Sequence, residues 1–137
     1  MSRLELKHPE RKAYTGGYAD GVVLGGWLYV SGQGPLDLVT GEVVPASIED
    51  ETLRTLQNIE AVLAQHGCTK ADVAKCGCFL ADMADFERFD KAFSVFFDGI
   101  RPARTTVQAG LGFGIKVEID AVAFVPATSA AAANGAA

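Results

Sequence analysis

The chain has 137 residues and 49% of them are hydrophobic, which suits one globular domain with one core and excludes a disordered chain. Its net charge of −5 comes from 17 acidic and 12 basic residues, and the sequence contains no run of basic residues interleaved with aromatic ones. Both features argue against a nucleic-acid partner. No apolar run is long enough to span a bilayer, and the first 14 residues are too charged for a signal peptide, so we expect a cytoplasmic protein without a membrane partner.

Paired glycines organise the first third of the chain, after a charged and weakly patterned segment over residues 1–15. Gly25 and Gly26 separate two apolar segments, Gly21–Leu24 and Trp27–Ser31, and this pattern predicts a two-residue β-hairpin. Residues 31–45 are rich in glycine and proline and predict a loop.

A first amphipathic helix is predicted to begin after Ser47, a typical N-cap residue that precedes an acidic first turn. Gly67 should end this helix, because glycine accepts the left-handed backbone that follows many helices. The predicted core stripe of the helix consists of Leu53, Leu56, Ile59 and Leu63.

A buried strand is predicted at residues 75–81 (KCGCFLA), followed by a second helix that Asp85 should cap and Gly99 should end. Five phenylalanines recur in this helix at spacings of three and four, which indicates a core stripe rather than a cofactor site. They are Phe86, Phe89, Phe93, Phe96 and Phe97.

The three cysteines, Cys68, Cys76 and Cys78, are an odd number in a chain without an export signal, which predicts free thiols. Only His8 and His66 could complete a metal site, and both are distant in sequence, so we expect buried thiols and no metal.

The last structured segment, residues 101–124, reads as two strands joined by a loop with three glycines. An antiparallel hairpin is the simplest pairing. If Thr106 faces Glu118 in it, then Arg104, Thr106, Glu118 and Asp120 share one face, with Arg104 and Glu118 diagonal and about 7–8 Å apart. Such a pair could bind a small acid and move a proton, or it could be a surface salt bridge worth about 0–1 kcal/mol.

The order of strands, helix, strand, helix and two strands predicts an α+β domain in which two helices cover one face of a mixed or antiparallel sheet. The other face still carries apolar residues such as Val122 and Phe124, which predicts self-association. We expect a single domain over residues 1–126 and a disordered alanine-rich tail over residues 127–137.

Several segments together resemble the Rid (YjgF/RidA) family of enamine/imine deaminases, also labelled endoribonuclease L-PSP. The resemblance covers residues 16–125. It rests on GGYADG (16–21), YVSGQGPLD (29–37), TGEVV (40–44), Asn58, FLADMADFERFDKAF (79–93), RPARTTV (101–107) and KVEIDAVA (116–123).

This resemblance implies a chorismate-mutase-like (YjgF-like) fold, with a six-stranded mixed sheet and two helices on one face. It also implies a homotrimer with active sites between subunits. Arg104 would bind the substrate carboxylate, Glu118 would orient or activate water, and Tyr18 would wall the pocket from a neighbouring subunit. The implied substrate-binding residues are Tyr18, Ser31, Thr106 and Phe113.

The implied activity is hydrolysis of small 2-imino or enamino acids to 2-keto acids and ammonia, without cofactor or metal, as in 2-iminobutanoate/2-iminopropanoate deaminases. Three positions depart from the family pattern: Thr106 stands in place of a cysteine, Gly112 in place of a proline and Asp90 in place of an asparagine. These departures motivate an alternative, a non-catalytic carboxylate-binding or holdase-like protein. Ribonuclease action, suggested by the family label, fits poorly with the acidic charge and the lack of paired histidines.

Overall fold

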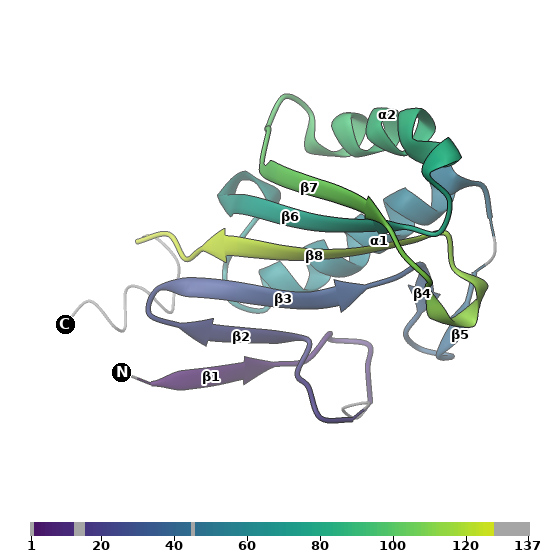
Figure 1. Cartoon of the computed structure of the whole chain (residues 1–137). Helices are drawn as coiled ribbons and strands as arrows, with labels where there is room; N and C mark the ends of the chain where they lie inside the picture. Colours follow the sequence, from purple (N-terminus) through teal and green to yellow (C-terminus); the bar gives the residue numbers. More distant parts are fainter. Residues whose placement is uncertain (1, 13–15, 45, 128–137) are drawn as a thin grey trace.

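The computed structural model describes residues 2–12, 16–44 and 46–127 (Figure 1). A six-stranded mixed sheet is covered on one face by two helices, as the resemblance implied. The strands of this sheet are β1 (Arg3–Leu6), β2 (Gly21–Leu24), β3 (Trp27–Gln33), β6 (Val73–Leu80), β7 (Ala103–Gln108) and β8 (Val117–Phe124). The helices are α1 (Ile48–Ala64) and α2 (Phe86–Phe97), and a small ribbon pairs β4 (Leu36–Asp37) with β5 (Glu42–Val43).

The strand order is β1-β2-β3-β8-β6-β7, so β6 lies between β7 and β8 (Figure 1). The predicted hairpin of β7 and β8 is therefore wrong. β7 pairs in parallel with β6, after a crossover through α2, whereas β8 runs antiparallel to both β3 and β6. A β-α-β crossover returns the chain to the same sheet in the same direction, and here it makes β7 an edge strand.

The early hairpin forms as the glycine pair predicted. Leu24 faces Trp27, and the two turn residues Gly25 and Gly26 have φ values of 63° and 83°. Positive φ at both central positions is the requirement of a type I′ turn, which glycine meets without steric cost. The weakly patterned N-terminal segment also supplies a strand, β1, which pairs with β2 at the sheet edge.

Helix α1 begins where the capping signal predicted, and Ser47 Oγ accepts a hydrogen bond from the Asp50 N–H at 3.2 Å. It ends at Ala64, three residues before Gly67. The helix packs on β3 and β8 through a stripe that includes Leu56, Ile59 and Leu63. Leu53 is exposed on its outer face, so its assignment to the core stripe is wrong.

Helix α2 buries Phe89, Phe93 and Phe97 in the core, while Phe86 and Phe96 pack partly buried against them. The aromatic stripe is thus core, as its spacing indicated. Asp85 precedes the helix but makes no capping hydrogen bond. The helix ends at Phe97, and the C-cap residue Asp98 has a left-handed backbone conformation, with Gly99 following at a φ of 88°.

The sheet face opposite the helices, called here the open face, is apolar over much of its area. Leu24, Trp27 and Phe124 stand in one row across β2, β3 and β8, and all three side chains are exposed. Trp27 and Phe124 contact edge to face, with ring centroids 5.0 Å apart. The predicted uncovered apolar face is therefore present.

None of the described helices is long and apolar enough to cross a lipid bilayer. The prediction of a disordered tail concerns residues that, from position 128 onward, lie outside the described part of the chain.

Candidate functional site

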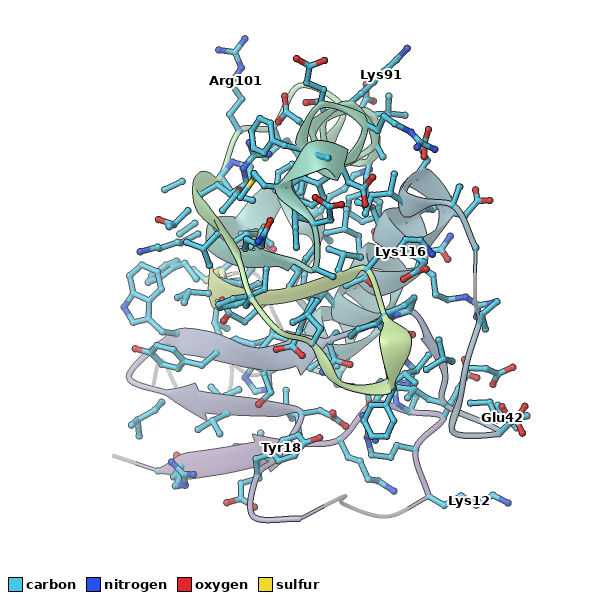
Figure 2. All side chains as sticks on the ribbon, turned by 45° about the vertical axis from the view of Figure 1, so that its right-hand side comes forward. Lys12, Tyr18, Glu42, Lys91, Arg101 and Lys116 are labelled. Atoms are coloured by element: carbon cyan, nitrogen blue, oxygen red, sulfur yellow. The ribbon has the colours of Figure 1, made fainter. Side chains whose placement is uncertain are left out.

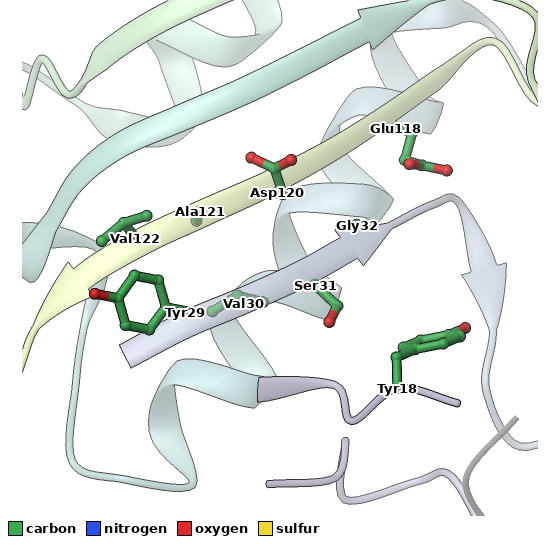
Figure 3. Close-up of a pocket in the computed structure, with 9 residues that line it drawn as sticks. All are labelled: Tyr18, Tyr29, Val30, Ser31, Gly32, Glu118, Asp120, Ala121 and Val122. Carbon is green, nitrogen blue, oxygen red and sulfur yellow. The ribbon is translucent and has the colours of Figure 1, made fainter. Parts of the chain in front are cut away.

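The open face carries a hollow of about 620 Å³, called here the open-face pocket (Figure 3). Three of the predicted site residues line it: Glu118 projects from β8, Ser31 from β3, and Tyr18 from the loop before β2. The remaining lining residues are Tyr29, Val30, Gly32, Asp120, Ala121 and Val122.

A β-bulge shapes the floor of this pocket. Val30 faces Ala121 and Gln33 faces Ile119, so Ser31 and Gly32 of β3 together lie opposite Asp120. The absence of a side chain at Gly32 leaves room for the carboxylate of Glu118, since a Cβ there would lie 2.6 Å from Glu118 Oε2. Any larger residue at Gly32 would displace that carboxylate.

Two carboxylates on β8 point into the pocket. Asp120 accepts a hydrogen bond from the Gly77 N–H at 3.0 Å. Burial raises the pKa of Glu118 above its ordinary value of 4.5, and the neighbouring charge of Asp120 raises it further. A carboxyl group with a raised pKa in a pocket is a candidate for taking and returning protons.

Tyr18 is placed over the pocket by the two residues that follow it. Ser31 Oγ donates to the Ala19 carbonyl at 2.6 Å, and the Ser31 N–H donates to the Asp20 carbonyl at 2.9 Å. These bonds fasten the loop to β3 beside the bulge. Figure 2 shows Tyr18 on the side of the molecule that carries β1 and β2.

The same loop is anchored underneath by Asp20, whose side chain is only 1% exposed. Its carboxylate accepts hydrogen bonds from Arg11 Nε at 2.8 Å, Arg11 Nη2 at 3.0 Å, the His8 N–H at 2.8 Å and Gln33 Nε2 at 3.3 Å. Burial alone would raise the pKa of Asp20, but these donors outweigh burial and hold the pKa below its ordinary value. Asp20 therefore joins the N-terminal segment, the Tyr18 loop and β3.

Arg104 lies on the opposite side of the sheet. It faces Cys76 of β6, whose partner on β8 is Ala121, and both of those residues are buried beneath the helices. Arg104 lines a second hollow of about 300 Å³, called here the helix-side pocket, together with Asp90 and Arg101. Arg101 marks the end of the molecule that carries α2 and β7 (Figure 2).

The predicted convergence of Arg104 and Glu118 on one face does not occur within the chain. Because β6 separates their strands, Thr106 faces Cys78 rather than Glu118, and it shares the helix side with Arg104. Phe113 lines neither pocket: its side chain is 88% exposed in the short 3₁₀ turn Gly112–Gly114, at a φ of 61°. A positive φ is uncommon for a residue with a large side chain.

The site contains residues that sequence reasoning did not select as site residues. Asp120 shares the polar face of its strand with Glu118, and that alternation is the signal that could have identified it. The positions of Gly32, Gly77 and Tyr29 in the site depend on how the strands pair, and no local sequence pattern reveals that pairing. Asp90 was noted only as a departure from the family pattern.

The cysteines are free and buried, and burial raises the pKa of Cys76 to about 12, so its thiol stays protonated at neutral pH. Within residues 2–12, 16–44 and 46–127, no group of three or more potential metal ligands comes together.

Known proteins resemble the chain over most of its length. The profile of the family described as Endoribonuclease L-PSP matches residues 9–125. A RutC family protein of Saccharolobus solfataricus is 42% identical over 109 residues, which cover 79% of this chain and 86% of that protein. The 2-iminobutanoate/2-iminopropanoate deaminase of Mus musculus is 37% identical over 112 residues, covering 81% of this chain and 83% of the deaminase.

The crystal structure of the YjgF gene product from E. coli matches with a TM-score of 0.82 at 31% sequence identity. That match covers 90% of this chain and 99% of the other, so the two folds correspond over nearly their whole length.

Proposed function

Because the chain belongs to the endoribonuclease L-PSP (Rid/YjgF) family, we propose that it hydrolyses small 2-imino or enamino acids to 2-keto acids and ammonia. The observation that carries this proposal is Glu118, a carboxyl group of raised pKa in a 620 Å³ pocket on the open face. The likeness to the mouse deaminase supports the substrate class.

In the proposed reaction the enamine first tautomerises to the imine. Glu118 orients a water molecule and takes its proton as the oxygen attacks the imine carbon. Glu118 passes this proton to the nitrogen, which gives the carbinolamine. Glu118 then takes the proton of the new hydroxyl group and delivers it to the amino nitrogen, so the C–N bond breaks as the C=O bond forms, and ammonia leaves with the 2-keto acid. No step requires a redox partner, because the carbon keeps its oxidation state.

Arg104 would contribute from a neighbouring protomer, because it lies on the far side of the sheet from Glu118 in its own chain. It stands on β7, the edge strand, where an adjoining protomer can approach it. A planar guanidinium matches a carboxylate through two parallel hydrogen bonds, which suits it to hold a 2-imino acid. Tyr18, Ser31 and Glu118 would then come from one protomer and Arg104 from the next.

The direct test generates imino acids in place with an amino acid oxidase and follows ammonia release or the loss of semicarbazone formation. The expected result is hydrolysis well above the buffer rate for at least one small 2-imino acid. If pyruvate binds in calorimetry but no imino acid is hydrolysed faster than in buffer, the protein is a carboxylate-binding member of the family rather than an enzyme.

We expect the protein to self-associate, because nothing in the single chain covers the exposed row of Leu24, Trp27 and Phe124 on the open face, and the family resemblance implies that the assembly is a trimer. Light scattering at micromolar concentration should give a mass about three times the 14.4 kDa of the chain. Trp27→Glu should shift that mass toward the monomer and abolish imine hydrolysis together with assembly. A wild-type monomer that hydrolyses imines would contradict the shared site.

A further inference from the structure

Among the described residues, the ion pair between Asp90 and Arg104 differs from the pairs Arg11–Asp20 and Arg88–Glu49. Arg11 and Arg88 each hold a carboxylate through both Nε and Nη2. Arg104 approaches Asp90 through Nη1, which lies 2.8 Å from Asp90 Oδ1. A guanidinium carries five N–H donors, so the contact with Asp90 leaves N–H groups of Arg104 that can bind a second carboxylate.

Aromatic rings hold the guanidinium of Arg104 from the helix side. Its Cζ lies 4.8 Å from the ring centroid of Phe93, 5.4 Å from that of Phe89 and 5.6 Å from that of Phe86. The Arg104 side chain is 20% exposed and that of Asp90 is 45% exposed, so the ion pair stands at the rim of the helix-side pocket. The guanidinium is thus held by aromatic rings of α2 and by Asp90 at the rim of the pocket.

We propose that Asp90 is a positioning residue for Arg104 and also competes, as an anion, with the substrate carboxylate for the same guanidinium. This inference rests on the proposed function, because it takes Arg104 as the carboxylate-binding group. Asp90 holds Nη1 and orients the remaining N–H groups. Its negative charge lies beside the guanidinium that the incoming carboxylate contacts. This charge therefore weakens the binding of every 2-imino acid and 2-keto acid.

The competition has a consequence for turnover. The 2-keto acid product keeps the carboxylate of the substrate, so a neighbouring anion that weakens carboxylate binding also speeds release of the product. Charges separated by about 6 Å in a partly solvated site repel by an amount that corresponds to roughly 3- to 10-fold in a binding constant. Screening by salt should reduce this effect, because Asp90 is reached by solvent.

The test measures the dissociation constant of pyruvate by calorimetry for the wild type, Asp90→Asn and Asp90→Ala. Asp90→Asn removes the charge but keeps an oxygen that can accept from Nη1, so it should bind pyruvate about 3- to 10-fold more tightly at low salt. The gain should shrink toward twofold or less in 1 M NaCl. Asp90→Ala loses the oxygen as well, so it should bind less tightly than Asp90→Asn.

Glu87→Gln is the matched control, because it removes one exposed carboxylate from the same helix at a site outside both pockets. It should leave the pyruvate affinity unchanged. In an Arg104→Met background, Asp90→Asn should no longer tighten binding, since the group for which the two anions compete is gone.

Two failures are distinguishable. If the wild type hydrolyses imines but Asp90→Asn binds pyruvate no more tightly than the wild type, the inference about Asp90 is wrong and the proposed function stands. If the wild type neither binds pyruvate nor hydrolyses imines, both are wrong, because Arg104 then binds no carboxylate for which Asp90 could compete.

Discussion

Glu118→Gln is expected to lower kcat for imine hydrolysis by about 10²- to 10⁴-fold and to leave the affinity for pyruvate nearly unchanged. The glutamine side chain keeps the size of Glu118 and fits over Gly32, but it cannot take a proton from water. Because the proposed role of Glu118 is exercised in the transition state, turnover should fall while binding of an unreactive keto acid persists. Wild-type turnover in this variant would show that Glu118 is not the base.

The loss should not come from unfolding, and the pKa of Glu118 provides the check. A raised folded-state pKa means that the ionised carboxylate costs stability above that pKa, and that the cost is absent below the ordinary value of 4.5. Glu118→Gln removes this cost. At neutral pH it should therefore be at least as stable as the wild type in urea, and the difference should vanish in acid.

The pH dependence of kcat/KM gives a second view of the same group. If the ionised carboxylate is the base, the acidic limb of the profile should lie above pH 4.5. Asp120→Asn keeps an acceptor for the Gly77 N–H but removes the neighbouring charge, so this limb should move to lower pH while burial keeps it above 4.5. A limb that does not move would mean that Asp120 has no influence on the base.

Asp20→Ala is expected to destabilise the protein by about 3–5 kcal/mol at neutral pH, the range found when one partner of a buried ion pair is removed. The substitution leaves Arg11, whose side chain is 13% exposed, without its carboxylate, and it leaves the His8 N–H without its acceptor. Urea unfolding at one fixed protein concentration measures the change, because the stability of an oligomer depends on concentration.

Glu49→Ala is the matched control for this prediction. The Glu49–Arg88 pair has the same two-point geometry, but both side chains are about half exposed, so its removal should change stability far less. Because the folded pKa of Asp20 lies below its ordinary value of 3.8, its contribution is present above that pH and is lost as the pH falls through the folded pKa. Equal effects of the two substitutions would contradict the role of burial.

Local patterns predicted the elements of the fold because each such signal acts within a few residues. Ser47 caps α1 through the next turn of the same helix, the phenylalanines of α2 follow the period of one helix, and Gly25-Gly26 closes one hairpin. The exposed apolar face also followed from alternation along β8. Motifs spread along the chain carried the family resemblance, which the comparisons confirmed.

Strand pairing was decided by the tertiary structure. Nothing in residues 101–124 reveals that β6 enters between β7 and β8, because that arrangement depends on α2 packing against the sheet after a parallel crossover. The same pairing turns Arg104 toward Phe93 and Asp90 and leaves Glu118 on the open face. Sequence alone identified both candidate side chains. The face of the sheet that each one occupies depends on which strands pair, and the burial of hydrophobic residues from segments distant in sequence determines that pairing.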